Sequence, residues 1–119
     1  MERIDGIGGV FLRARDPHAL AAWYATHLGI AVENYGGATL TAAAGEVTVW
    51  SVFPHETDYF GAREQQAMVN YRIRDLDAML AQLRAAGAQV DERVEQQEYG
   101  RFGWAADPEG NRFELWQPT

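Results

Sequence analysis

Two arginines and one glutamate are the residues of this chain best suited to chemistry. Arg13 lies in the run Val10–Asp16, and Arg72 lies at the corresponding place in the similar run Val69–Asp75, 59 residues later. Glu114 lies in the last apolar stretch of the chain. A guanidinium group can bind an anion or stabilise a developing negative charge, and a carboxylate can act as a general base. The chain therefore has the groups for anion binding and proton transfer, provided that its fold brings them together.

Other residue types exclude several kinds of site. The chain contains no cysteine, which excludes disulfides, thiolate metal sites and cysteine nucleophiles and fits a cytoplasmic location. His18 and His27 lie in a predicted helix, and His55 lies in a polar linker. No spacing such as His-x-x-x-His supports metal coordination, so we expect these histidines to be solvated or partly packed. His55 is the best exception, because a linker can fold over a cavity.

Length and charge limit the remaining possibilities. A chain of 119 residues can bury one core but not two independent ones, so we expect a single domain over residues 1–119. A net charge of -7 makes nucleic acid an unsuitable partner, because such a surface repels phosphate backbones. No apolar run approaches the length of a membrane span, and we expect no membrane partner.

The two halves of the chain predict the same series of elements. In the first half, residues 10–15 alternate as a half-buried strand does. Asp16-Pro17 then starts a helix that stops at Gly29. Three short strands are predicted over residues 30–35, 39–43 and 47–53.

In the second half, a strand begins at Val69 and Asp75 caps a helix that ends at Gly87. Three strands are predicted near residues 89–94, 99–106 and 111–117, the last two joined by a hairpin turn at residues 107–111. Gly100 and Gly103 interrupt an aromatic run, which indicates either a bulge or close approach of a ligand, or a packed edge strand with a tight turn. The first unit is thus placed at about residues 5–54, a linker at about 55–66 and the second unit at about 67–119.

This pattern resembles the vicinal oxygen chelate superfamily, which includes glyoxalase I, the bleomycin-resistance proteins and extradiol dioxygenases. The resemblance rests on the paired strand-plus-Asp openings, on Trp23-Tyr24 and Leu28-Gly29, and on residues 107–111 before Phe113-Glu114-Leu115. It implies an α+β fold of two βαβββ modules whose curved mixed sheets enclose a cavity. It also implies a homodimer, because many members dimerise and some exchange modules between subunits.

Members of that superfamily typically hold a divalent metal through four positions, which here correspond to Gly9, Thr48, Met68 and Glu114. Of these, Glu114 alone is a competent ligand for a hard divalent cation. Glycine has no side chain, a thioether is a poor ligand for such ions, and a neutral hydroxyl is a weak one. We therefore expect no tightly bound metal and no other cofactor.

Strand alternation places a set of polar and aromatic side chains on the cavity side of both modules. These residues suit a planar or partly apolar small molecule that carries a polar or anionic group. Alternatively, the arginines pair with nearby carboxylates, the tryptophans are packing residues, and Glu114 is a structural acceptor paired with Arg13 or Arg72. The expected cavity residues are Phe11, Arg13, Thr48, Trp50, Asn70, Arg72, Glu114 and Trp116, with Tyr59, Phe60 and Tyr99 as candidates for a lid.

Three functions are compatible with the sequence. The first is a metal-independent protein that binds or sequesters a small organic molecule, with a degenerate metal site. The second is a metal-dependent lyase or isomerase of the glyoxalase I type. The third is a metal-independent enzyme in which Glu114 is the base and Arg13 or Arg72 stabilises the developing charge. Turnover distinguishes the first from the third, and metal content identifies the second.

Overall fold

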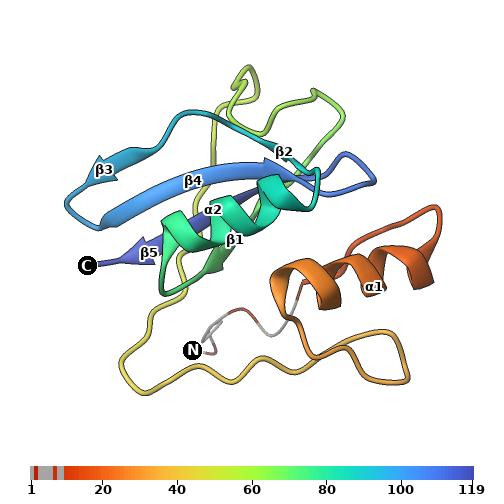
Figure 1. The fold of residues 1–119 in the computed structure, drawn as a ribbon. Helices are drawn as coiled ribbons and strands as arrows, with labels where there is room; N and C mark the ends of the chain where they lie inside the picture. The colour runs from red at the N-terminus through yellow and green to blue at the C-terminus, as the bar shows by residue number, and fades with distance from the viewer. Residues whose placement is uncertain (1, 3–6, 8–9) are drawn as a thin grey trace.

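The computed structural model describes Glu2, Ile7 and residues 10–119, which form an α+β fold with one mixed sheet and two helices (Figure 1). Neither helix in this part of the chain is long and apolar enough to cross a membrane. The elements in chain order are α1 (Pro17–Leu28), β1 (Val69–Arg72), α2 (Leu76–Ala85), β2 (Gln89–Val90), β3 (Glu95–Gln97), β4 (Gly100–Ala106) and β5 (Arg112–Pro118).

The second half of the chain builds the sheet in the predicted strand-helix-strand order, except that two short strands, β2 and β3, replace the single strand predicted near residues 89–94. The strands lie in the order β1-β5-β4-β2, and β3 pairs separately with β4. β1 runs parallel to β5, whereas β4 is antiparallel to β5, β2 and β3. The turn between β4 and β5 is the predicted one, with Gly110 in the left-handed region at φ 86°. This hairpin forms the centre of the sheet, because β5 and β4 lie between β1 and β2.

Helix α2 covers one face of this sheet. Asp75 caps it, because its side chain accepts a hydrogen bond from the Ala78 amide at 3.0 Å. Its apolar stripe is fully buried against alternate residues of β4 and β5. This core consists of Leu76, Leu80, Leu83, Ala105, Phe113 and Leu115.

The two glycines of β4 are explained by packing within the protein. A Cβ on Gly100 would lie 2.1 Å from the carbonyl oxygen of Gln117, and the φ of Gly100 is +136°. A Cβ on Gly103 would lie 3.2 Å from methyl groups of Leu76 and Leu80. Gly100 thus allows close approach of β5, and Gly103 allows close approach of α2. This agrees with the alternative of a packed strand with a tight turn.

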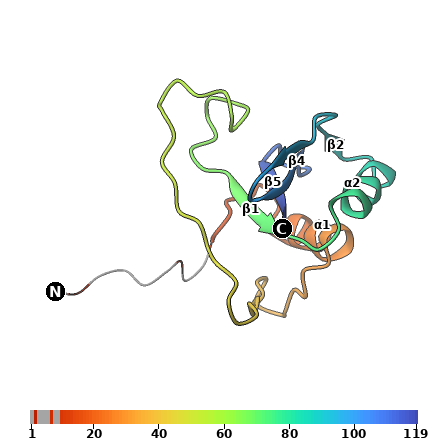
Figure 2. The ribbon, with the colours of Figure 1, turned by 90° about the vertical axis from the view of Figure 1, so that its left-hand side faces the viewer.

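Helix α1 packs against the second half of the chain (Figures 1 and 2). Its ends are as predicted: Asp16 accepts a hydrogen bond from Ala19, and Gly29 has φ 72°. The buried Tyr24 hydroxyl donates to Asp107 Oδ2 at 2.7 Å, and the Trp23 and Tyr24 rings lie 6.5 and 6.3 Å from that of Phe113. The helix is thus anchored to the β4–β5 hairpin.

The four strands predicted for the first half are not formed in the chain. Between residues 10 and 68, all described, α1 is the only helix or strand. Residues 10–15, 30–35, 39–43 and 47–53 lie outside any sheet, and their segment runs as an open loop below the sheet in Figure 1. A strand is stable only when a neighbour satisfies its backbone groups, and none of these segments pairs with an edge of the sheet. The expected pair of βαβββ modules is thus realised as one sheet module plus α1.

Candidate functional site

The face of the sheet opposite α2 carries the polar and aromatic side chains, and we call it the open face. Its residues alternate with the core residues along each strand, as the pleat of a strand requires. Trp104 on β4 and Asn70 on β1 are both direct register partners of Glu114 on β5. The open face consists of Asn70, Arg72, Phe102, Trp104, Arg112, Glu114 and Trp116.

Glu114 lies at the centre of this face and is almost completely buried, with 9% exposure. Asn70 Nδ2 donates to its Oε1 at 2.7 Å, and Trp104 Nε1 donates to its Oε2 at 3.0 Å. The Tyr59 hydroxyl donates to the same Oε2. Three donors from three parts of the chain therefore satisfy one carboxyl group, as a buried polar group requires.

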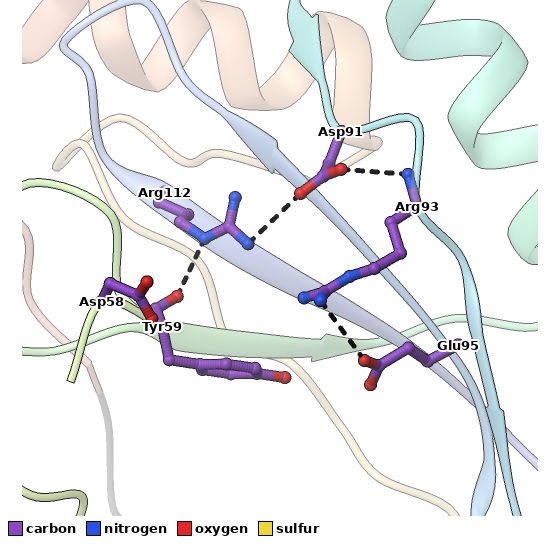
Figure 3. Close-up of a pocket in the computed structure, with 6 residues that line it drawn as sticks. All are labelled: Asp58, Tyr59, Asp91, Arg93, Glu95 and Arg112. Atoms are coloured by element: carbon purple, nitrogen blue, oxygen red, sulfur yellow. Dashed lines mark hydrogen bonds and ion pairs between the residues drawn. The ribbon is translucent and has the colours of Figure 1, made fainter.

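Tyr59 comes from the linker, which folds over the open face as a strap. Its ring stacks on Phe53 with centroids 5.2 Å apart and meets the Trp104 ring edge-on at 5.8 Å. Arg112 Nε donates to the Tyr59 carbonyl at 2.9 Å (Figure 3). Burial, and then the hydrogen bond to Glu114, raise the pKa of the Tyr59 phenol above its ordinary value. The phenol is thus held protonated as a donor.

A pocket of about 460 Å³ opens beside this network. Two ion pairs cross it: Arg112 to Asp91 at 3.5 Å, and Arg93 to Glu95 at 3.6 Å (Figure 3). The Arg93 and Arg112 guanidinium groups lie 4.9 and 5.7 Å from the centre of the Trp104 ring. The pocket is lined by Asp58, Tyr59, Asp91, Arg93, Glu95 and Arg112.

Several of the predicted site residues are brought together by the sheet, but not all in one cluster. Asn70 and Tyr59 contact Glu114 directly. Trp116 lies farther along β5, where its ring stacks on Phe102 with centroids 6.1 Å apart. Arg72 forms an ion pair with Glu46 and also donates to the Val47 carbonyl. This agrees with the alternative that the arginines pair with nearby carboxylates.

The predicted residues of the first half lie elsewhere. Phe11 is 96% exposed and Trp50 is 74% exposed, and Arg13 and Thr48 are also exposed. Tyr99 is 61% exposed at the start of β4, and its carbonyl accepts a hydrogen bond from Trp116. Within one chain, these five side chains make no hydrogen bond to Glu114. Phe11, Arg13, Thr48 and Trp50 would reach the open face only if the first half formed strands that paired with the sheet, and it does not.

Three of the four positions that correspond to metal ligands in similar proteins lie in the described part of the chain. Gly9 lies outside the described residues, Thr48 is exposed on the extended segment, and Met68 has a thioether. Among Glu2, Ile7 and residues 10–119, no three histidine, cysteine, aspartate or glutamate side chains gather closely enough to hold a metal ion. The donors around Glu114 are an amide, an indole and a phenol, which suit a carboxylate acceptor rather than a cation.

Sequence reasoning missed the residues on the far side of the pocket. Asp91 and Arg93 lie between β2 and β3, and Glu95 is the first residue of β3. The sequence predicts a single strand near residues 89–94, whose polar side chains gave no signal of a site. Trp104 was part of a recognised aromatic run, and the alternation of β4 against β5 was the signal that could have paired it with Glu114. Arg112 shares the parity of Glu114, so strand alternation by itself already predicts it on the same face, nearer the start of the strand.

A family model described as a glyoxalase-like domain matches residues 9–116. No curated protein sequence matches the chain significantly. Among solved structures, TnmS3, an antibiotic-binding protein from Streptomyces sp. CB03234, is 24% identical with a TM-score of 0.54, over 87% of this chain and 88% of that one. A member of the glyoxalase/bleomycin resistance protein/dioxygenase superfamily from Sphaerobacter thermophilus is 19% identical with a TM-score of 0.53, over 87% and 90%. A lactoylglutathione lyase from Agrobacterium tumefaciens is 15% identical with a TM-score of 0.55, over 98% and 96%.

Proposed function

We propose that this chain, which belongs to the glyoxalase-like domain family, binds a small organic molecule on its open face without using a metal. The observation that carries the proposal is the hydrogen bonding and the aromatic surroundings of Glu114. Both of its carboxyl oxygens accept hydrogen bonds from protein donors, in a setting lined by Trp104, Tyr59 and two guanidinium groups. Aromatic surface with a few directed polar groups is typical of a site for small organic molecules.

The donors around Glu114 favour binding over metal-dependent catalysis. A divalent cation at Glu114 would have to displace Tyr59 and would face the amide of Asn70 and the N–H of Trp104, which has no lone pair to offer. The other positions that correspond to ligands supply neither a carboxylate nor an imidazole. Glu114 is thus better suited to accept hydrogen bonds from a ligand than to coordinate a metal.

The charges around the pocket indicate which ligands to test. Three carboxylates and two guanidinium groups line it, and the whole chain carries a net charge of -7. This balance favours neutral or cationic molecules with polar groups. TnmS3, which shares the fold, is an antibiotic-binding protein, so aromatic antibiotics are reasonable first probes.

The proposal is tested by calorimetric titration of the native chain with doxorubicin, bleomycin and a wider antibiotic panel, each with and without EDTA. We expect saturable binding of at least one compound, unchanged by EDTA and weakened in Arg93→Ala. Val94→Ser, a change at a neighbouring exposed position, serves as the matched control. Absence of binding across the panel, together with zinc- or nickel-dependent formation of lactoylglutathione, would favour the lyase instead.

We also propose that the protein is a homodimer. The exposed large apolar side chains belong mainly to the first half, where Val49, Trp50 and Val52 are 66%, 74% and 77% exposed and only Ser51 interrupts them. Several exposed large apolar side chains close together in sequence favour an interface, and the outer edge of β1 offers unpaired backbone groups. A second copy could pair with these segments and carry Phe11, Arg13, Thr48 and Trp50 to a site.

A further inference from the structure

The position on Glu114 that an external ligand would use is occupied by a group from the chain itself. That group is the phenol of Tyr59, whose hydroxyl donates to Glu114 Oε2. The same oxygen accepts from Trp104 Nε1 at 3.0 Å, so the indole and the phenol share one acceptor. A phenol is protonated across the neutral range, so Tyr59 is a donor there, and its raised pKa extends this to higher pH.

Two aromatic side chains, Phe53 and Trp104, pack against the Tyr59 ring. The Phe53 ring lies almost parallel to that of Tyr59, with 16° between the planes. The Trp104 ring is almost perpendicular, at 87°. Stacked and edge-to-face arrangements are the two favoured geometries for aromatic pairs. The ring and hydroxyl of Tyr59 are therefore both recognised by neighbouring groups.

The strap is anchored by contacts that do not involve the Tyr59 ring. Arg112 Nε donates to the Tyr59 carbonyl at 2.9 Å. Gln65 makes two hydrogen bonds to the backbone of Arg112: its Nε2 donates to the carbonyl at 2.7 Å, and its Oε1 accepts from the amide at 2.9 Å. Rotation of the Tyr59 side chain would leave all three of these bonds in place.

We propose that Tyr59 is an internal ligand, and that the phenol group of an external aromatic molecule replaces it on Glu114 and Trp104. This inference rests on the proposed function and deepens it, because it assigns a chemical class to the ligand. The hydroxyl of the incoming molecule donates to Glu114, and its ring takes the place of the Tyr59 ring. Tyr59 thereby sets the specificity of the site. Displacing Tyr59 loses the free energy of its contacts, and only a ligand that makes the same contacts recovers that free energy.

The test removes the internal phenol and supplies it from solution. In Tyr59→Ala, p-cresol, which is the side chain of tyrosine without its backbone, should bind and raise the melting temperature. Toluene has the same ring without the hydroxyl, so we expect it to bind about ten- to a hundredfold more weakly, the ratio that corresponds to a hydrogen bond with a charged partner. In the native chain Tyr59 competes, and p-cresol should bind more weakly than in Tyr59→Ala.

Two further variants complete the test. Adding Glu114→Gln to Tyr59→Ala should reduce the preference for p-cresol over toluene. Tyr59→Phe keeps the ring but loses the bond to Glu114, so it should bind p-cresol more tightly than the native chain even if Tyr59→Ala does not fold. Equal affinities of p-cresol and toluene for Tyr59→Ala, or of p-cresol for Tyr59→Phe and the native chain, would overturn the inference. If the native chain still binds an antibiotic in that case, the proposed function stands without it.

Discussion

At the scale of single residues, Glu114 is the centre of the site because of where its donors come from. Asn70 reaches it from β1, Trp104 from β4 and Tyr59 from the strap, so one carboxyl group connects three parts of the chain. A buried carboxylate without partners would be strongly destabilising. The same network therefore stabilises the fold and prepares the acceptor that a ligand would use.

We expect Glu114→Gln to lower the free energy of unfolding by about 2 kcal/mol, because a glutamine amide would place its NH₂ group against donors that now face a carboxylate oxygen. Urea unfolding followed by tryptophan fluorescence measures this change. Glu92→Gln, at an exposed position, is the matched control and should change stability little. Equal stability of the two variants would show that the three hydrogen bonds to Glu114 contribute nothing.

The tyrosines predict a loss of stability at alkaline pH. Burial raises the pKa of Tyr24, Tyr59 and Tyr71 above the ordinary value of 10.0, so each phenol stays neutral in the folded chain. Their contribution is fully present below the pKa of the unfolded chain and is lost as the pH rises above it. We expect the melting temperature to fall steeply above about pH 10.

Tyr24→Phe isolates the contribution of Tyr24 to this effect. It should melt lower than the native chain at pH 8, because the hydrogen bond to Asp107 is lost, yet show a shallower fall above pH 10. Tyr35→Phe, at a position with 71% exposure, should leave the profile unchanged. A native profile that is flat from pH 8 to 12 would contradict the linkage.

At the scale of elements, the β4–β5 hairpin positions everything else. It supplies Trp104 and Glu114 to the open face, buries Phe113 and Leu115 under α2, and accepts Tyr24 of α1 at its turn. The strap is held by the first residue of β5. The hairpin therefore both carries the site and anchors the strap that covers it.

We expect Gly100→Ala to destabilise the protein by about 2–4 kcal/mol, because its Cβ would overlap the carbonyl of Gln117 on β5 and its backbone would be strained. Thermal unfolding measures the change. Gly110→Ala is the matched control: it also has positive φ but open space around it, so about 1 kcal/mol is expected. Similar losses for both variants would show that the contact with Gln117 is not limiting.

At the scale of the whole molecule, one half of the chain is folded into a sheet and the other presents apolar segments. The second half buries its own core, whereas most of the exposed large apolar residues lie between positions 7 and 53. Many exposed large apolar side chains in one segment are typical of a surface that a partner covers. This asymmetry supports the proposed dimer.

Sedimentation at micromolar concentration should show a species of twice the 13.3 kDa chain mass. Trp50→Ser should shift it toward the monomer, because an exposed tryptophan in the apolar run is a suitable anchor for a partner. Val94→Ser, an exposed apolar position of the second half, should leave the dimer intact. A native chain that sediments at 13.3 kDa would exclude the dimer.

The sequence by itself determined the parts of this protein that depend on local rules. Asp16 and Asp75 cap their helices, Gly29 ends the first helix, and residues 107–111 form the hairpin turn, because capping and turn chemistry act over a few residues. Strand parity likewise placed Asn70 and Glu114 on one face. The resemblance gave the family, which the match over residues 9–116 confirms.

Only the tertiary structure decided what those elements pack against. It paired Arg72 with Glu46, bent the linker so that Tyr59 meets Glu114, and left residues 47–53 without a sheet. Alternation tells which face of a strand is apolar, but it does not tell which strand will be its neighbour, because pairing is a contact between residues far apart in sequence. The Tyr59–Glu114 contact joins residues 55 positions apart, and no local pattern encodes it.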